Sequence, residues 1–516
     1  MQTEKDYSVG REIHGLRCES VGEYSLPDYN GDVKKILLIK SKVFPAGKFV
    51  GEDSLEFSGT VGYEVVYVDA ENSVTHAEFS TDYDAAVKVD SVSYIDSDVK
   101  TSVSHCNMRL IGPRKLSVKC ALESDVRISE KRIYSVDGDA FMDRQPEYTE
   151  QSAMIYTSSF AFGEARRIDE ELISIEGAIA DEVEVLLSEV RASVDSCDVD
   201  DGHAHLKCRA DMTLLYRNGE DVPKKVDKEI TFAEEIEVDA DLVDSVIEAR
   251  IEAAELKAAV SPTEEGVSLT VSVTAHPIIC ARRNARLDVI TDAYLKERGT
   301  ENEYGEFSYT EHICSESVEE KYEADHDSSE LDLPGDAEVL YSDASVRIEE
   351  CEIVGDTVKV SGEIRFSGIA VHVTCDGDTI YTPIKITDHF AENVNINCQT
   401  HDNLRVNCHA NADDVKLEID NSSLKASCTL GIFLSVCSER RQRCLGSSYA
   451  TDEEYIKDDS VVTVYYPDSS ESLFDIARKF HTSVSAIAQS NRLSESVFMS
   501  VRQPVGAHGL KKLLIK

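Results

Sequence analysis

The strongest constraint on the fold of this chain is an internal repeat of about 150 residues. Three similar segments begin at residues 36, 185 and 339, and they cover residues 36–43, 185–192 and 339–346. A spacing of this size is typical of whole domains, whereas solenoid repeats are about 20 to 50 residues long. The repeat therefore predicts three copies of one domain-sized module.

Each copy continues with the same succession of segments. A strand-like stretch (55–67, 204–216 or 358–373) is followed by a turn with Asp, Asn or Gly and then by an alternating segment around Phe79, Phe232 or Phe390. In the first copy, the apolar residues on one face of this stretch are Leu55, Phe57, Val61, Tyr63, Val65 and Tyr67. Later in the second copy, the corresponding set is Val267, Leu269, Val271, Val273 and Ala275. This period of two indicates half-buried strands, and many short strands at regular spacing are typical of a sandwich or a barrel.

The sequence therefore predicts a mainly β fold, with three related β-sandwich-like or barrel-like modules followed by a small α/β domain. The modules are expected at residues 20–136, 165–295 and 336–445, and the small domain at 460–516. Residues 296–335 are acidic and are expected to be a linker. Residues 137–169 are a candidate for the first strand of module two. Residues 242–260 are rich in Ala and Glu and compatible with a helix, but analogy with the other copies favours strands.

The chain is strongly acidic, with 98 Asp and Glu against 53 Lys and Arg and a net charge of −45. Such a surface repels nucleic acid and anionic bilayers, because both are bound through their negative charges. Nucleic acid is therefore excluded as a partner. The acidity has two interpretations: it keeps a large protein soluble, or it steers the protein toward a basic partner.

The 14 cysteines are scattered singly, without a C-x-x-C pair. Reduced thiols in the cytosol fit this pattern, and many of the cysteines would act as small apolar fillers within strands. Residues 1–15 lack the apolar core of a signal peptide, and no segment approaches 18 consecutive apolar residues. We therefore expect a cytoplasmic protein without membrane insertion.

The pattern changes after Gly446. Residues 462–466 read as a strand, and Ser470 is the expected N-cap of a helix with an apolar stripe formed by Leu473, Ile476, Ala477 and Phe480. Thr482 or Ser483 would cap a second helix, whose buried face is formed by Val484, Ile487 and Ala488. Residues 512–515 supply a closing strand. The predicted order is strand, helix, helix, strand.

These residues resemble a LysM domain. Residues 472–480 are similar to the family motif Thr-Leu-Trp-x-Ile-Ala-x-x-Tyr, and residues 482–487 with Asn491 and Leu493 are similar to its second helix and the Asn-x-Leu that follows. Two loops differ: Ser-Glu-Ser at 470–472 replaces Gly-Asp-Thr, and residues 506–510 replace Pro-Gly-Gln. Both loops hold N-acetylglucosamine chains in the family, so their changes favour a protein partner over a glycan.

The resemblance implies that a partner or glycan is bound by two loops of this domain. The expected contact residues are Asp468, Ser469, Ser470, Glu471, Ser472, Phe474, Asn491, Arg492 and Leu493. For Phe474, as for Tyr465 and Tyr466, packing is an equally good interpretation.

Three repeats ahead of a C-terminal LysM domain resemble the SipL-like spore coat morphogenetic proteins of spore-forming Firmicutes. This resemblance implies a non-enzymatic scaffold on the mother-cell side of the forespore surface. It implies docking through LysM onto the ATPase of the coat basement layer, with other spore coat proteins as further partners. The alternative is a LysM protein that binds peptidoglycan and acts on cortex or cell wall. A third interpretation is a cytosolic adhesion scaffold with no link to sporulation.

Signatures of catalysis are missing from the sequence, since it contains neither G-x-S-x-G nor a phosphate-binding loop. We therefore expect no enzymatic activity, no catalytic residue and no cofactor. Two sets of residues contain possible metal ligands: Cys398, His401, Cys408 and His409, and His203, His205 and Cys208. Adjacent residues such as Cys408 and His409 point to opposite faces of a strand, so we expect no metal site.

Two basic clusters stand out in this acidic chain. They are Arg282, Arg283 and Arg286, and Arg440, Arg441 and Arg443. We interpret them either as docking points for an acidic surface or as parts of solvated loops between modules.

Overall fold

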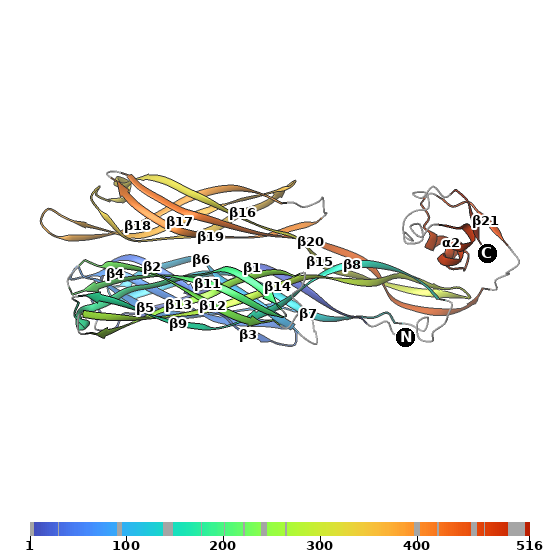
Figure 1. The fold of residues 1–516 in the computed structure, drawn as a ribbon, viewed down its shortest axis with the longest axis horizontal. Coiled ribbons are helices and arrows are strands. Elements are labelled where there is room, and N and C mark those ends of the chain that lie inside the picture. The colour runs from blue at the N-terminus through green and yellow to red at the C-terminus, as the bar shows by residue number, and fades with distance from the viewer. Residues whose placement is uncertain are drawn as a thin grey trace.

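The fold is known from a computed structural model, which describes residues 5–28, 30–89, 95–137, 148–176, 178–200, 202–219, 222–238, 245–263, 266–396, 403–420, 423–455, 462–468, 470–493 and 511–515. Within these ranges nearly all regular structure is β-strand, and the two α-helices both lie near the C-terminus (Figure 1). The prediction of a mainly β chain with a small α/β domain is confirmed.

The first module consists of two antiparallel sheets. One sheet contains β2 (Val33–Val43), β4 (Ser54–Asp69) and β5 (Val74–Lys88), with the short β3 (Gly47–Val50) also paired to β4. The other contains β1 (Lys5–Ser25), β7 (Lys115–Tyr134) and β6 (Ile95–Gly112).

The second and third modules repeat this arrangement. In the second module, one sheet has the strand order β10 (Val183–Asp200), β11 (His203–Asn218), β12 (Lys224–Glu237). The other sheet has the order β13 (Val246–Pro262), β14 (Gly266–Leu295), β8 (Tyr148–Glu164), and β9 (Arg167–Glu176) also pairs with β14. In the third, the sheets are β16 (Glu338–Val354), β17 (Thr357–Val373), β18 (Thr379–Asn395) and β15 (Arg298–Asp327), β20 (Ser423–Glu454), β19 (Leu404–Asp420). Two 3₁₀ turns, η1 (Ala180–Glu182) and η2 (Ser328–Leu331), precede β10 and β16. The sheets stay open, so the modules are sandwich-like and not barrels.

The alternation in the sequence explains the core of each module. The inward residues of β4 are all buried, from Leu55 at 0 % exposure to Tyr67 at 0 %, and the inward residues of β14 from Val267 to Ala275 are buried as well. Apolar burial of this kind contributes about 25 cal/mol for each Å² removed from water. The turn between the second and third strands of the first sheet has a residue with positive φ in every copy: Asn72, Gly219 and Gly377.

Three segments can be compared with their expectations. Residues 242–260 contain β13, so the strand interpretation was right and the helix was not. Strand β8 does join the second module by pairing with β14. The expected linker at 296–335 was wrong in its secondary structure, because it contains the 30-residue strand β15, which pairs with β20 from Asp327 to Arg298. The acidic residues along this segment made the strand hard to recognise in the sequence. Its pairing with β20 stabilises the strand as much as the burial of apolar side chains does.

The first strands of the three copies, β2, β10 and β16, come together where the modules meet. Equivalent leucines of these strands, Leu37, Leu186 and Leu340, are buried in one shared cluster. Beside them, Lys40 forms ion pairs with Glu189 at 2.9 Å and with Asp343. These three charged residues also occupy equivalent positions in the repeat, four residues after each start. A complementary set of charges therefore joins the copies at their common junction.

The second sheets extend beyond the modules as a stalk, made of the ends of β7, β8, β14, β15 and β20 (Figure 1). Strands of 30 and 32 residues form much of it, far longer than the usual five or six. The stalk has its own core, which includes Tyr134, Ile155, Val289 and Leu445 from strands of all three modules. The small C-terminal domain lies at the far end of the stalk (Figure 1).

Candidate binding site at the end of the stalk

The small domain has the predicted strand–helix–helix–strand order. It consists of β21 (Thr463–Tyr465), α1 (Leu473–Lys479), α2 (Val484–Asn491) and β22 (Leu513–Ile515), and β21 pairs antiparallel with β22. The expected apolar stripe is confirmed, since Leu473, Ile476, Val484 and Ile487 are buried and Phe480 packs against them.

The N-cap of the first helix is Ser472, and the prediction of Ser470 was wrong. The Ser472 hydroxyl accepts a hydrogen bond from the backbone N–H of Asp475 at 3.1 Å, and the Asp475 carboxylate accepts one from the Ser472 N–H at 3.2 Å. This reciprocal capping box satisfies two donors at the helix start. Ser472 is buried and committed to the helix, so it cannot contact a partner directly. The second helix is capped by Ser483, as one of the two expected alternatives.

Phe474 was also expected to contact a partner, but its side chain is not accessible. Its side chain has 0 % exposure and packs edge-on against Tyr294 of β14, with ring centroids 5.3 Å apart. Of the two interpretations of this aromatic residue, packing is the one that the structure bears out.

The first loop is organised by Glu471. Its carboxylate accepts hydrogen bonds from the Tyr465 hydroxyl at 2.9 and 2.8 Å and from the backbone N–H of Asp468 at 2.9 Å. Lys479 lies 3.7 Å from the same carboxylate, and its ammonium donates to the Tyr465 hydroxyl, which raises the pKa of Lys479. Glu471 therefore holds the loop against β21 and α1, while Asp468 and Ser470 are exposed. Ser469 lies outside the described residues.

The second loop is organised by Asn491. Its amide nitrogen donates to the carbonyls of Ile487 at 2.8 Å and Leu514 at 2.7 Å, and its oxygen accepts from the Leu514 N–H at 2.7 Å. Arg492 follows in the left-handed region, with φ 49°, and is exposed. Leu493 is half-buried against the small core. Asn491 thus ties α2 to β22, and among the described residues of this loop (491–493) Arg492 is the exposed one.

A third set of contacts fixes the domain on the stalk. The Tyr294 hydroxyl donates to the Thr482 carbonyl at 2.5 Å, and Arg478 forms an ion pair with Asp292 at 2.7 Å. The ring of Tyr455 stacks on His481, with centroids 3.6 Å apart. Burial raises the pKa of Tyr294 to about 12, so its hydroxyl keeps its proton at neutral pH.

The stalk therefore holds the domain by the turn between its helices and by α1, and leaves other surfaces open. Asp468, Ser470 and Arg492 remain exposed. So does the outer face of the two-stranded sheet, where Val464 (45 %) lies opposite Leu514 and is followed by Tyr466 (69 %). This outer face was not predicted from the sequence, although the alternation over 462–466 already places Val464 and Tyr466 on one side.

The possible metal-ligand sets are not assembled in the described part of the chain. Cys208 is buried in the core of module two, while His203 and His205 lie beside Glu235 at 3.2 and 3.8 Å. His409 lies 3.5 Å from Asp125 of module one. Cys398 and His401 are outside the described residues.

The basic clusters lie on strands and not in loops between modules, so that interpretation was wrong. Arg282 is buried; it donates to Ser435 of module three at 2.6 Å and binds Glu12 of module one. On β20, Arg440 pairs with Glu311 at 3.2 Å, and Arg443 lies over the Tyr304 ring at 3.7 Å. These contacts tie strands together within the molecule.

Comparison with known proteins identifies two domains. A family model described as the SipL SPOCS domain matches residues 32–111, which correspond to β2 to β6 of the first module, and a LysM domain model matches residues 469–503. No curated protein and no solved structure is found to match the chain. Both matched domains are non-catalytic binding domains. No helix among the described residues is long and apolar enough to span a bilayer. The chain is thus SipL-like, a sporulation-related binding protein that contains a SPOCS domain and a C-terminal LysM domain.

Proposed function

We propose that this protein is a non-enzymatic scaffold of spore coat assembly, which docks through its LysM domain onto the ATPase of the coat basement layer. The observation that carries the proposal is the mounting of the LysM domain. It is held at the far end of the stalk by Tyr294 and Asp292, while Asp468, Ser470 and Arg492 face solvent. A binding head separated from three linked modules suits a protein that attaches at one end and recruits further coat proteins at the other.

The docking would take place on the mother-cell side of the forespore surface. Contacts would come from the exposed residues of the two loops, positioned by Glu471 and Asn491. The Glu471 carboxylate is used inside the domain and is therefore not available to sugar hydroxyls, which supports a protein partner. The second candidate is peptidoglycan, because glycan binding is the usual activity of a LysM domain.

A parallel titration tests the proposal. The full chain would be titrated with the purified coat-basement ATPase and, separately, with soluble peptidoglycan fragments. The double variant Asp468→Lys, Arg492→Glu reverses two exposed charges without touching the capping box or the core. Gln489→Ala, a neutral and exposed change on α2 three residues before Arg492, is the control, because it leaves both reversed charges in place.

We expect saturable binding to the ATPase, at least tenfold weaker for the double variant and unchanged for Gln489→Ala. Unaltered far-ultraviolet circular dichroism would show that the variants are folded. Binding to peptidoglycan with no response to the ATPase would overturn the docking proposal in favour of the glycan candidate.

A further inference from the structure

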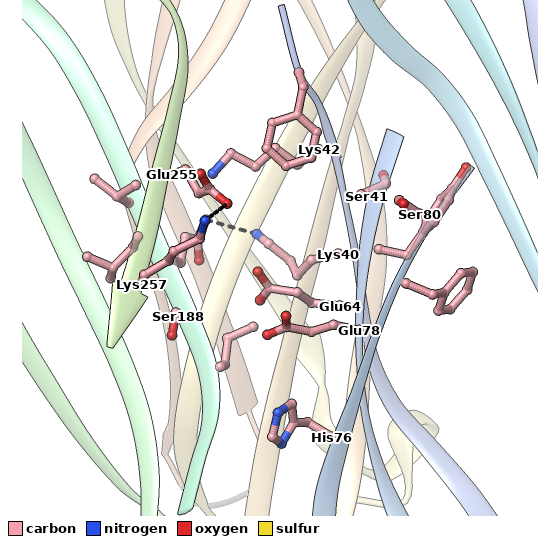
Figure 2. Close-up of a pocket in the computed structure, with 18 of the residues that line it drawn as sticks. Lys40, Ser41, Lys42, Glu64, His76, Glu78, Ser80, Ser188, Glu255 and Lys257 are labelled. Carbon is pink, nitrogen blue, oxygen red and sulfur yellow. Dashed lines mark hydrogen bonds and ion pairs between the residues drawn. The ribbon is translucent and has the colours of Figure 1, made fainter. Parts of the chain in front are cut away.

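A cavity of about 840 Å³ lies between modules one and two (Figure 2). Its floor is the outward face of the sheet formed by β2, β4 and β5, and its opposite wall is formed by the edge strands β10 and β13. Ligand sites in proteins commonly have volumes of about 300 to 1,000 Å³. The cavity is therefore large enough for a small molecule, and it lies far from the LysM domain (Figure 1).

The charges on the floor differ from those at the same place in the other copies. In module one, Glu64 at the centre of the sheet lies opposite Lys40 on one side and opposite Glu78 on the other. The equivalent rows are Glu189, Thr213 and Asp227 in module two and Asp343, Ser367 and Lys385 in module three. Module one therefore has two carboxylates side by side in this row. The equivalent rows of modules two and three do not.

Neither carboxylate of module one is in direct contact with a base in the described part of the chain; Lys42 and Lys40 act on Glu64 through their charge and lower its pKa against the effect of burial. Lys40, the neighbour of Glu64, is committed to Glu189 and Asp343 at the junction of the three modules. Among the residues that the structure describes, no hydrogen bond or ion pair reaches the side chain of Glu64 or Glu78. Burial, and then the charge of Glu78, raises the pKa of Glu64 to about 7. Figure 2 shows the two side chains next to each other inside the cavity. Two adjacent carboxylates of this kind can form a binding site for a cation.

A positive charge lies on the same face of the sheet, one row of residues away from the two carboxylates. Lys42 is two residues beyond Lys40 on β2, so the rows are about 6.6 Å apart at 3.3 Å per residue. Within the described ranges its ammonium has no ion-pair partner, and burial lowers its pKa. Lys42 lies opposite Gly62, which has no side chain to cover the floor. A Cβ at Gly62 would come within 2.8 Å of the Phe44 ring, so this position has no room for a larger residue unless Phe44 moves.

The equivalent row of module two has a different composition. It contains Arg191, Asp211 and Glu229, and its base, Arg191, forms ion pairs with Glu189 and Asp343. In the corresponding row of module one, Lys42 lies opposite Gly62, and Gly62 lies opposite Ser80. On the opposite wall, Lys257 and Glu255 form an ion pair at 3.2 Å, and the charge of Glu255, after that of Glu64, acts on Lys42 and favours its ammonium form.

We propose that this cavity binds a small zwitterion whose ammonium and carboxylate groups are separated by a flexible apolar chain. The ammonium lies between Glu64 and Glu78, the carboxylate lies on Lys42, and the chain crosses Gly62 beside Phe44. Basic amino acids and ω-amino acids have this chemistry. The site is independent of LysM docking, so the two proposals can fail separately.

The probe is 6-aminohexanoate, which carries the two charges at the ends of five methylene groups. Isothermal titration of the full chain would be compared with hexylamine, which lacks the carboxylate, and with hexanoate, which lacks the ammonium. We expect saturable binding of 6-aminohexanoate and at least tenfold weaker binding of either single-charge analogue. L-lysine would show whether an additional α-amino group is accepted.

Three variants assign the contacts. Lys42→Met should weaken 6-aminohexanoate at least tenfold and leave hexylamine unchanged, whereas Glu78→Gln should weaken both amines. Asp227→Asn, the matched change at the equivalent position of module two, should leave all affinities unchanged. These side chains lie on an outward sheet face, and circular dichroism would check that each variant is folded. No saturable binding of 6-aminohexanoate at millimolar concentration, or equal binding by the wild type and Lys42→Met, would overturn the proposal.

Discussion

Glu64 is a carboxyl group whose pKa is strongly changed by folding. Its pKa in the folded protein is about 7, above the ordinary value of 4.5, because burial and Glu78 both disfavour the charged form. A carboxyl group with a raised pKa binds its proton more tightly in the folded than in the unfolded state. Folding stability therefore decreases as the pH rises from about 4.5 to about 7.

The variant Glu64→Gln should remove this loss. We expect its melting temperature to exceed that of the wild type at pH 8, with the difference shrinking or vanishing at pH 4, where Glu64 is protonated in both states. One pKa unit corresponds to about 1.4 kcal/mol, so the effect is measurable by thermal unfolding. Asp227→Asn serves as the control. A difference between variant and wild type that is the same at both pH values would contradict the assignment.

At the scale of a single element, α1 depends on its N-cap residue, Ser472. Ser472→Ala deletes the hydroxyl that accepts the Asp475 N–H, and the loss of such a cap costs about 1 kcal/mol. We expect amide hydrogen exchange in α1 to become about fivefold faster, since 1.4 kcal/mol is a factor of ten, while exchange in β14 is unchanged. Ser470→Ala is the matched control, because Ser470 was the cap expected from sequence and is not one. Equal acceleration by both variants would show that Ser472 is not the residue that caps the helix.

Much of the fold at this scale could be read from the sequence. Alternation identified β4 and β14, positive-φ residues at Asn72, Gly219 and Gly377 stood at recognisable turn signals, and the helical stripe located α1 and α2. Strand β15 was missed because carboxylates occur on both of its faces, and its pairing with β20 is a property of two segments more than 90 residues apart. Pairing of this kind leaves no local apolar signature.

The candidate site was predictable only in part. The motif places one loop before α1 and one after α2, and their role in binding stays a prediction. Which of their side chains face solvent depends on contacts that the motif does not contain. Phe474 is covered by Tyr294, which lies 180 residues earlier in the chain. The cavity was invisible in the sequence, because it depends on Lys40 being taken up by two other modules.

At the scale of the whole molecule, the orientation of the LysM domain rests on a few contacts with the stalk. The double variant Asp292→Asn, Tyr294→Phe removes the ion pair with Arg478 and the hydrogen bond to Thr482 while keeping the ring against Phe474. Losing a partner of a buried polar group costs about 1 to 3 kcal/mol. We expect the domain to leave its docked position in a large fraction of molecules.

Small-angle X-ray scattering of the full chain would report this change as an altered radius of gyration and distance distribution. Tyr449→Phe, a change to an exposed tyrosine of the same stalk, is the control and should scatter like the wild type. Scattering of the double variant that is indistinguishable from the wild type would mean that other contacts suffice to hold the domain.

The long strands of the stalk have a mechanical consequence. The LysM domain follows β20 in the chain, and β20 is paired with β15 from Ser423 to Glu454. A pull on the domain along the stalk would therefore load the backbone hydrogen bonds of this ladder in shear, many at once, and not one after another as in unzipping. The attachment can then carry tension between an anchored head and whatever the three modules hold, and it would yield by slippage of a whole ladder.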